Sequence, residues 1–533
     1  MNQPQIKHNK KILIILAIFF VFVYSFLAFR AGTIFNSPDE NANYFFANLF
    51  ARESRLDYPL KENSDIIHPR SMAVADQKIV PQSFLGMPLI YGFLGKIFGS
   101  NAIIFFTPII AAISVLFFYE IIKKIFDEKI AFLSSVLVFI NPAFWYYSTH
   151  SMYHNVLFAS LLIMGIYFFV KNNSNAQNKK QCANIILGSI FIGLSLMARY
   201  SEIPWVVLIL IILYFFNKDK ISKKQAIICF LILFVLSIPI FFLNNKLYGN
   251  PLSNGYSSIG KSIDTNSISA SIRSSLLLNT LRVAVLNIFR NSWNYGIYLF
   301  WWLSLPTCFG IFLLLKNYKK LESKQKKYLI AFLIGSVYLI LYYGSWSFHD
   351  NPDPTKITIG TSYARYWLPI YIFSMPFLSM LLLKIKQKRM AKSNAIFLCV
   401  LALLISYNVL FVFKLTDESI GRNVLGQYAE IKNAVLNLTE NNSIIIAGYY
   451  DKLFFPDRLV IENIDEERDK RLNEISKLLE KKRPIYYYSW NSDQDILYLN
   501  KILNKYKLNL TNAKKIREGE RLFDVVMVEK NKN

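Results

Sequence analysis

Acid is scarce in the greater part of this sequence, and cysteine is scarce throughout. Of the 35 acidic residues, 19 follow Lys414, and the preceding residues carry nearly all of the net charge of +25. The four cysteines show no C-x-x-C or Cys/His spacing, so neither a disulfide framework nor a structural zinc site is supported. The region after residue 415 has no G-x-G-x-x-G and no P-loop, so no nucleotide is assigned to it.

Apolar and aromatic residues are abundant, at 53% and 16% of the chain, which is too much for a soluble protein of ordinary composition. The sequence therefore predicts an α-helical polytopic membrane protein. A strongly basic chain could instead bind nucleic acid, but here the basic residues lie in short loops between apolar runs. That distribution follows the positive-inside rule, so no nucleic-acid partner is expected.

About eleven apolar runs are long enough to cross a bilayer, which takes about 20 residues of helix. They lie at roughly 12–30, 103–122, 130–148, 154–170, 184–199, 203–217, 225–243, 294–315, 327–345, 363–384 and 393–414. The first run is longer than a usual signal-peptide core and is followed by many more spans. We therefore expect it to be an uncleaved span.

A twelfth run, Phe84–Phe98, decides the topology. If it does not cross, every basic cluster between later spans falls on the same side as the basic N-terminus, which is then cytoplasmic. The run is also short and contains Gly86, Pro88, Gly92 and Gly95, which favours a segment in the outer interface. The polar loops at the other ends of the spans would then share the outer face of the cell membrane.

This topology predicts a transmembrane domain over residues 1–415, with outer loops at 31–101 and 244–293. Residues 416–533 have a soluble composition and are predicted to form a small extracytoplasmic α/β domain. Three of its segments read as strands and two as helices. The strands are expected at 443–450, 484–488 and 522–528, and the helices at 466–482 and 493–505.

An acidic pair, Asp39 and Glu40, follows the first span in the stretch Asn36-Ser-Pro-Asp-Glu-Asn-Ala-Asn-Tyr44. One interpretation is local: Ser37 as N-cap and Glu40 three residues into a helix make a capping box, with acids favourably placed on the helix dipole. The other is chemical, because a carboxylate at the outer membrane face can act as general base for an acceptor hydroxyl.

Several short motifs in residues 10–415 together resemble the C-type (GT-C) glycosyltransferases, in particular protein O-mannosyltransferases and the aminoarabinose transferases of lipid A, a glycosyltransferase family 39-like pattern. They are Pro-Asp-Glu after one span, His68-Pro69, Phe84-Leu-Gly-Met-Pro-Leu-Ile-Tyr-Gly, Ile140-Asn-Pro-Ala-Phe-Trp-Tyr-Tyr-Ser, Met197-Ala-Arg-Tyr200 and Ala364-Arg-Tyr-Trp-Leu-Pro369.

The resemblance implies a membrane transferase that moves a sugar from a polyprenyl-phosphate carrier to an acceptor with inversion. Asp39 would match the family's catalytic acid, and Glu40 its supporting neighbour. A base for the acceptor hydroxyl and cationic help for the departing phosphate suit a single displacement. The chain departs from the aminoarabinose transferases at Ala42, where they have an arginine.

The candidates for binding the donor phosphate are Arg199 and Arg365, because a guanidinium matches phosphate oxygens. The alternatives are that Arg199 pairs with Glu202 and that Arg365 only reaches toward the interface. Three further residues from the same segments complete the donor-site prediction. They are His154, Tyr200 and Tyr366.

His68, His349 and Asp350 are candidates for the acceptor side, with loop solvation as the alternative for His349 and Asp350. His150 and His154, four residues apart, could hold a metal on one helix face, but are more often hydrogen-bonded polar groups. The sequence therefore assigns no metal and no cofactor, and a divalent cation is not indicated.

Two other functions compete with the transferase. A transporter or flippase of lipid-linked saccharides would have ionisable residues in mid-span and often repeated halves, and few such residues and no convincing repeat are found. A non-enzymatic membrane protein with an outer binding domain is the third hypothesis. In that case the outer-loop carboxylates would be dispensable.

Overall fold

The chain divides into two compact units in a computed structural model. Unit 1 comprises Met1–Arg30, Ile104–Ile240 and Ile263–Arg422, and unit 2 comprises Ala31–Ile103, Phe241–Ser262 and Asn423–Asn533. The structure describes residues 3–61, 64–171, 178–216, 222–253, 255, 278–348, 350, 353, 355–387, 391–415, 418, 420, 423–464 and 468–528. This grouping does not test the boundary predicted near residue 415, which stays a prediction.

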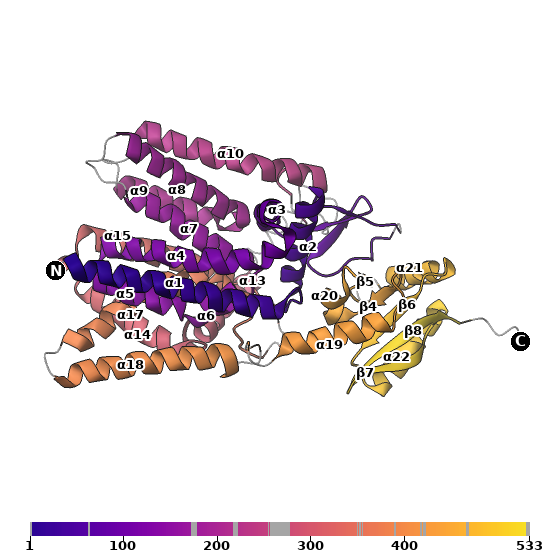
Figure 1. The fold of residues 1–533 in the computed structure, drawn as a ribbon. Helices are drawn as coiled ribbons and strands as arrows, with labels where there is room; N and C mark the ends of the chain where they lie inside the picture. Colours follow the sequence, from indigo (N-terminus) through magenta and orange to yellow (C-terminus); the bar gives the residue numbers. More distant parts are fainter. Residues whose placement is uncertain are drawn as a thin grey trace, which may run out of the picture. The chain divides into compact units, whose positions relative to one another are not determined.

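Unit 1 is built of long apolar helices that run side by side (Figure 1). They are α1 (Gln3–Ala31), α4 (Ile103–Ile125), α5 (Glu128–Phe139), α6 (Pro142–Thr149), α7 (His154–Lys171), α8 (Asn178–Ala198), α9 (Ile203–Phe216), α10 (Lys223–Tyr248, whose last turns belong to unit 2), α13 (Leu278–Asn291), α14 (Trp301–Lys316), α15 (Ser323–Gly344), α16 (Ser362–Tyr366), α17 (Leu368–Gln387) and α18 (Ala391–Leu410). Among the described residues, 8 helices are long and apolar enough to cross a membrane, or up to 10 if each bent pair is one span.

Each of the predicted spans has a counterpart in a helix or a helix pair. Eight correspond to single long helices, and the run at 130–148 is the bent pair α5 and α6. The run at 294–315 is shorter than expected, because the chain turns by 100° between Tyr298 and Trp301. The run at 203–217 is a shorter apolar helix, Tyr200–Ile212, in the span search over the described residues. The chain is therefore a multi-pass membrane protein.

The start of α1 and the end of α4 lie at the same end of unit 1. Lys10 Nζ donates to Glu120 Oε1 at 2.7 Å, and Lys324 Nζ donates to the carbonyl of Lys124 at 3.4 Å. The helices α1 and α4 therefore run antiparallel within unit 1. α3 (Gly86–Phe98), in the segment between them, has 13 residues, fewer than a span needs. This arrangement agrees with a segment that does not cross.

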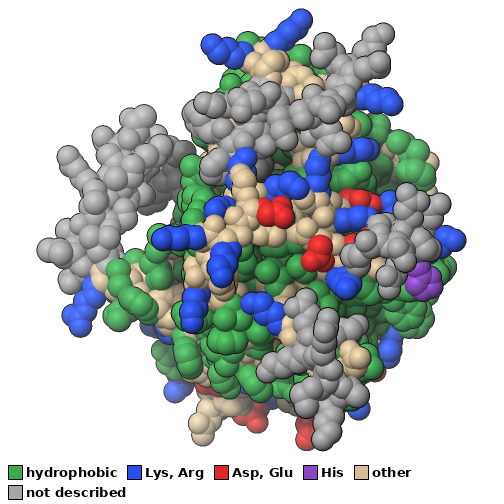
Figure 2. Space-filling view, turned by 90° about the vertical axis from the view of Figure 1, so that its left-hand side faces the viewer, with side chains coloured by type: hydrophobic (Ala, Val, Ile, Leu, Met, Phe, Trp, Pro, Cys, Tyr) green, Lys and Arg blue, Asp and Glu red, His purple; other side chains and the backbone are tan. Residues whose placement is uncertain are grey.

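Lys and Arg side chains gather on the end of unit 1 at which α1 begins, where few acidic side chains are visible (Figure 2). Acidic side chains at this end pair with nearby lysines. Lys123 Nζ, for example, lies 3.5 Å from Glu128 Oε2. Such a basic end is what the positive-inside rule predicts for the cytoplasmic side.

The break between α5 and α6 lies at the Asn141-Pro142 motif. Pro142 begins α6, and Asn141 Oδ1 caps it by accepting the N–H of Phe144 at 3.1 Å. The Tyr24 hydroxyl donates to the carbonyl of Phe139 at 2.6 Å, which satisfies a polar group at the end of α5. The pair bends by 51°.

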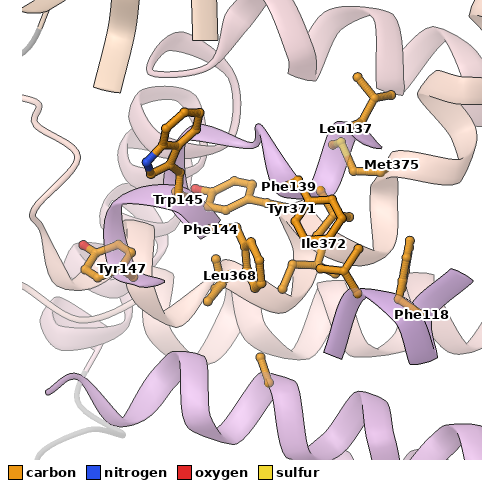
Figure 3. Close-up of a cluster of buried hydrophobic side chains, with 14 of the residues drawn as sticks. Phe118, Leu137, Phe139, Phe144, Trp145, Tyr147, Leu368, Tyr371, Ile372 and Met375 are labelled. Atoms are coloured by element: carbon orange, nitrogen blue, oxygen red, sulfur yellow. The ribbon is translucent and has the colours of Figure 1, made fainter. Parts of the chain in front are cut away.

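The bend lies within a tightly packed apolar cluster that joins α4, α5, α6 and α17. Figure 3 shows that side chains of α6 and α17 face one another there, with Tyr371 and Ile372 near Phe144. These side chains are at most 7% exposed, so each contributes apolar burial of the kind that fixes helix packing. The cluster holds α6 and the start of α7 in fixed positions.

Unit 2 contains the first outer loop. Its elements are α2 (Pro38–Glu53), β1 (Tyr58–Pro59), β2 (Met72–Ala75), β3 (Lys78–Pro81) and α3, and the three strands pair antiparallel in the order β1-β3-β2. α2 packs closely on α3, because a Cβ on Gly92 would lie 2.8 Å from Phe50 Cβ. The glycines that made this run a poor span are thus used for helix contact.

Unit 2 also contains the carboxy-terminal α/β region, which confirms the predicted fold class. Its elements are α19 (Val424–Asn437), β4 (Ile444–Ile446), α20 (Asp451–Phe454), β5 (Leu459–Ile461), α21 (Arg468–Glu480), β6 (Ile485–Ser489), α22 (Asp493–Leu503), β7 (Leu508–Arg517) and β8 (Glu520–Met527). The sheet has the order β5-β4-β6-β8-β7, in which β4 is parallel to β5 and β6 and the pairs with β8 are antiparallel. The strands β5 and β7 and the helices α19 and α20 were not predicted.

Candidate active site

The acidic pair lies at the first turn of α2, and the predicted capping box is present. Ser37 Oγ accepts the N–H of Asp39 at 3.2 Å, and Glu40 Oε2 accepts the N–H of Ser37 at 3.3 Å. Glu40 is fully buried, whereas Asp39 is partly exposed. Glu40 therefore closes the cap, and Asp39 is the more exposed carboxylate of the pair.

Two contacts from elsewhere in unit 2 fix this turn. Ser71, between the His68-Pro69 motif and β2, donates its hydroxyl to Asp39 Oδ1 at 2.6 Å. Lys452 of α20 donates to the carbonyl of Asn36, just before the cap. A hydrogen bond to the charged form of a carboxylate favours that form. The geometry thus holds a carboxylate in one direction, as a general base requires.

His68, a predicted acceptor-side residue, lies instead against the carboxy-terminal sheet. It forms an isolated parallel bridge with Ile461, at the end of the edge strand β5. Burial lowers the pKa of the imidazole, and the positive charge of Arg471 lowers it further. The ring is therefore neutral at neutral pH, and its position suits a structural contact; its predicted role stays a prediction.

In unit 1, Arg199 is paired as the alternative interpretation expects. Its Nη2 lies 2.9 Å from Glu202 Oε1, and both side chains are at most 4% exposed. Glu202 also accepts from Trp205 Nε1 at 2.6 Å, and Arg199 Nη2 donates to the Tyr343 hydroxyl at 2.8 Å. A buried ion pair of this kind is strongly destabilised when one partner is lost. Arg199 is thus already neutralised by a carboxylate.

Arg365 occupies a different environment on α16. Its Nη2 donates to Ser362 Oγ at 2.8 Å, and its guanidinium lies 4.9 Å from the ring of Tyr153 and 5.2 Å from that of Tyr366. The guanidinium of Arg199 also lies over the ring of Tyr366, 4.5 Å from its centre. Tyr366 therefore contacts both arginines, and His154 follows Tyr153 at the start of α7, where it is buried. The structure thus brings three of the five predicted donor-site residues, Arg199, Arg365 and Tyr366, into contact.

The loop between α15 and α16 is anchored on α16. Asp350 accepts from the backbone N–H of Ser362 at 2.6 Å and from its hydroxyl at 3.0 Å. Asp350 thus reaches the residue that also contacts Arg365. His349 lies outside the described residues, and Tyr200 is half-buried in the turn Tyr200–Glu202.

His150 and His154, which were considered and not assigned as metal ligands, do not lie on one helix. His150 ends α6, where it stacks 4.2 Å from Tyr146, and His154 begins α7. In the part of the chain that the structure describes, no group of three or more His, Cys, Asp or Glu side chains could hold a metal ion.

The chain is similar to known proteins in part of its sequence and in its fold. The family model of dolichyl-phosphate-mannose-protein mannosyltransferases matches residues 85–242. No curated protein sequence matches the chain significantly.

The chain is similar to the crystal structure of ArnT from Cupriavidus metallidurans bound to undecaprenyl phosphate. The sequence identity is 11% and the TM-score 0.54, over 95% of this chain and 97% of that one. Apo ArnT gives a TM-score of 0.52 at 10% identity, with the same two coverages. The oligosaccharyltransferase AglB from Archaeoglobus fulgidus, in complex with an inhibitory peptide and a dolichol-phosphate, gives 0.51 at 11% identity over 97% of this chain and 75% of that one.

The chain has the GT-C fold. The structural similarity to ArnT covers 95% of this chain and so extends through both units. The match to the family model begins at residue 85, after the acidic pair at 39–40. At this level of identity the likeness shows the fold, and the roles of the site residues stay predictions.

Four residues around the acidic pair were missed by the sequence analysis: Arg70, Ser71, Asp451 and Lys452. Arg70 and Ser71 directly follow the His68-Pro69 motif, which was the nearest local signal. Asp451 and Lys452 lie more than 380 residues along the chain from their partners, and no local pattern marks them.

Proposed function

We propose that the chain is an integral-membrane glycosyltransferase that moves a sugar from a polyprenyl-phosphate carrier to an acceptor by an inverting single displacement. The observation that carries this proposal is the partly exposed Asp39 carboxylate, fixed at a helix start by the cap and by Ser71. The GT-C fold supports it, because its solved relatives are glycosyltransferases.

In the proposed reaction the acceptor hydroxyl oxygen attacks the anomeric carbon of the donor. The new glycosidic C–O bond forms as the bond from that carbon to the phosphate oxygen breaks. Asp39 takes the proton of the acceptor hydroxyl, and polyprenyl phosphate leaves with the bonding electron pair. No nucleotide or metal is needed for this balance.

The departing phosphate gains negative charge, which a fixed cation stabilises. We assign this role to Arg365, whose Nη2 donates to Ser362 Oγ, and keep Arg199, which pairs with Glu202, as the competing candidate. Tyr366, Tyr200 and His154 would line the donor side. ArnT has been solved with undecaprenyl phosphate and AglB with dolichol-phosphate, which supports a lipid-phosphate donor here.

The acceptor is a protein, a lipid or a glycan, and the sugar is a hexose or a related unit. The peptide bound to AglB makes a polypeptide one candidate. We place the reaction at the outer face of the cell membrane, with the N-terminus in the cytoplasm and residues 416–533 outside. The basic end of unit 1 in Figure 2 supports this orientation.

The stereochemistry of transfer tests the mechanism. Purified protein would be given polyprenyl-phosphate sugars of defined anomeric configuration with a panel of acceptors, and the product linkage would be assigned by NMR. We expect the opposite configuration in every product, because one displacement inverts the centre. Retention would overturn the single displacement and would make Asp39 a nucleophile instead of a base.

A further inference from the structure

We propose that the carboxy-terminal α/β region positions the candidate base Asp39 through the first outer loop, with Arg70, Ser71, Asp451 and Lys452 as positioning residues. All four lie in unit 2, together with Asp39 itself. The inference rests on the proposed function in one respect, namely the role of Asp39, and its structural part can be measured without activity.

The first link is an ion pair between Arg70 of the loop and Asp451 of α20. Arg70 Nη2 and Nε lie 2.7 Å and 3.0 Å from Asp451 Oδ1, and the backbone N–H of Arg70 donates to Asp451 Oδ2 at 2.5 Å. Asp451 is fully buried. Charge-assisted bonds that use both the side chain and the backbone of one residue fix that residue's direction as well as its position.

The same guanidinium is held from a second side. Arg70 Nη2 also donates to the carbonyl of Tyr449 at 2.6 Å, and its Cζ lies 4.6 Å from the centre of the Tyr449 ring. A planar guanidinium with a carboxylate at its edge and an aromatic ring at its face has little freedom to turn. Lysine cannot reproduce this fork.

The second link is Ser71, the next residue. It has a φ of +62°, which a non-glycine residue adopts only when its surroundings hold it there. In this conformation its hydroxyl reaches Asp39 Oδ1 at 2.6 Å. Because Arg70 is anchored on Asp451, the peptide that carries Ser71 is anchored too. The direction of the Asp39 carboxylate is thereby tied to α20.

The third link bypasses the loop. Lys452, next to Asp451, is only 4% exposed and donates to the carbonyl of Asn36, the residue before the N-cap of α2. Its ammonium lies 4.8 Å from the rings of both Tyr428 and Tyr449. Two adjacent residues of α20 thus bind the chain on both sides of Asp39: Lys452 holds the residue before the cap of its helix, and Asp451 holds Arg70, the neighbour of its hydrogen-bond donor Ser71.

Further contacts make the attachment extensive. The bridge between His68 and Ile461 adds the loop to the edge of the sheet, and Ser64 Oγ donates to Glu474 Oε2 at 2.6 Å. The Phe45 ring of α2 lies 4.8 Å from Phe455. Contacts at this many points restrict the movement of the first outer loop and α2, which suits a role in holding a reacting group. Misplacing such a group by about 1 Å can cost about 10²-fold in rate.

Asp451→Asn and Ser71→Ala in the full-length protein test the proposal, with Asp524→Asn as the matched control. Asp524 pairs with Lys514 at 3.2 Å in the same sheet, away from the loop. For Asp451→Asn we expect hydrogen exchange of the peptides covering 36–44 and 68–75 to accelerate at least about tenfold. We also expect kcat to fall by about 10²-fold with the KM for the lipid donor nearly unchanged. The control should change neither quantity.

Ser71→Ala gives a readout that a merely structural role would not move. Removing a donor from the Asp39 carboxylate disfavours its charged form, so the acid limb of kcat/KM should shift to higher pH while the fold is retained. Unchanged exchange at 36–44 in Asp451→Asn, or an unmoved acid limb in Ser71→Ala, would overturn the proposal. If the wild-type protein transfers no sugar, the proposed function fails, and the exchange measurement still decides whether the α/β region holds the Asp39 turn.

Discussion

Asp39→Asn is expected to lower the rate of sugar transfer by about 10²–10⁴-fold, the range typical for loss of a general base. The amide keeps the size of the side chain, and its oxygen can still accept the hydroxyl of Ser71, so the cap and the fold should survive. The fall should therefore appear in kcat, with the binding of the polyprenyl-phosphate donor nearly unchanged. Initial rates over a range of donor concentrations measure both.

Asp76→Asn is the matched control for that substitution. Asp76 is an exposed acid of the same outer loop, in the turn between β2 and β3, with a φ of +46° that asparagine also tolerates. It should transfer sugar at the wild-type rate. A wild-type rate in Asp39→Asn would instead show that the base lies elsewhere and would leave the acidic pair with capping alone.

Arg365→Met is expected to lower transfer by about 10²–10³-fold, because it removes a fixed cation that would stabilise the departing phosphate. Methionine keeps an unbranched apolar stem between Tyr153 and Tyr366, so the loss should reflect charge more than packing. Arg365→Lys should recover part of the rate, since it restores the charge without the planar fork. Turnover and the yield of folded protein are measured together.

The double variant Arg199→Met/Glu202→Gln provides the comparison. Changing both partners avoids leaving one buried charge uncompensated, as a single change at Arg199 would. We expect this variant to keep more activity than Arg365→Met. The reverse order, with Arg365→Met near wild type and the double variant inactive, would identify Arg199 as the phosphate ligand.

The features that the sequence predicted well are local ones. Hydropathy gave the spans, because a membrane helix is recognised from about 20 consecutive residues. The start of α2 was predicted from Ser37, Pro38 and Glu40, because a capping box can be recognised from four consecutive residues. The short length and the glycines of Phe84–Phe98 favoured a segment that does not cross, and in the structure two of these glycines lie in close contact with α2.

The features that were missed depend on distant or weak signals. β5 has three residues, and β7 carries the polar run Asn-Ala-Lys-Lys, so neither shows a clear strand pattern. The pairing of Arg70 with Asp451 joins residues 381 apart, and nothing in either segment identifies the other. The helix face considered for His150 and His154 is absent for a related reason, because the chain breaks between α6 and α7 and the two residues lie on different helices.

The fate of a doubly labelled donor tests the central claim most directly. The protein would be reconstituted in liposomes with a polyprenyl-phosphate sugar that carries one label in the sugar and another in the phosphate, together with acceptor. A glycosyltransferase separates the labels: the sugar label appears on the acceptor, and an equal amount of free polyprenyl phosphate remains in the bilayer. If both labels stay on one molecule that appears in the opposite leaflet, the chain is a transporter of lipid-linked sugars.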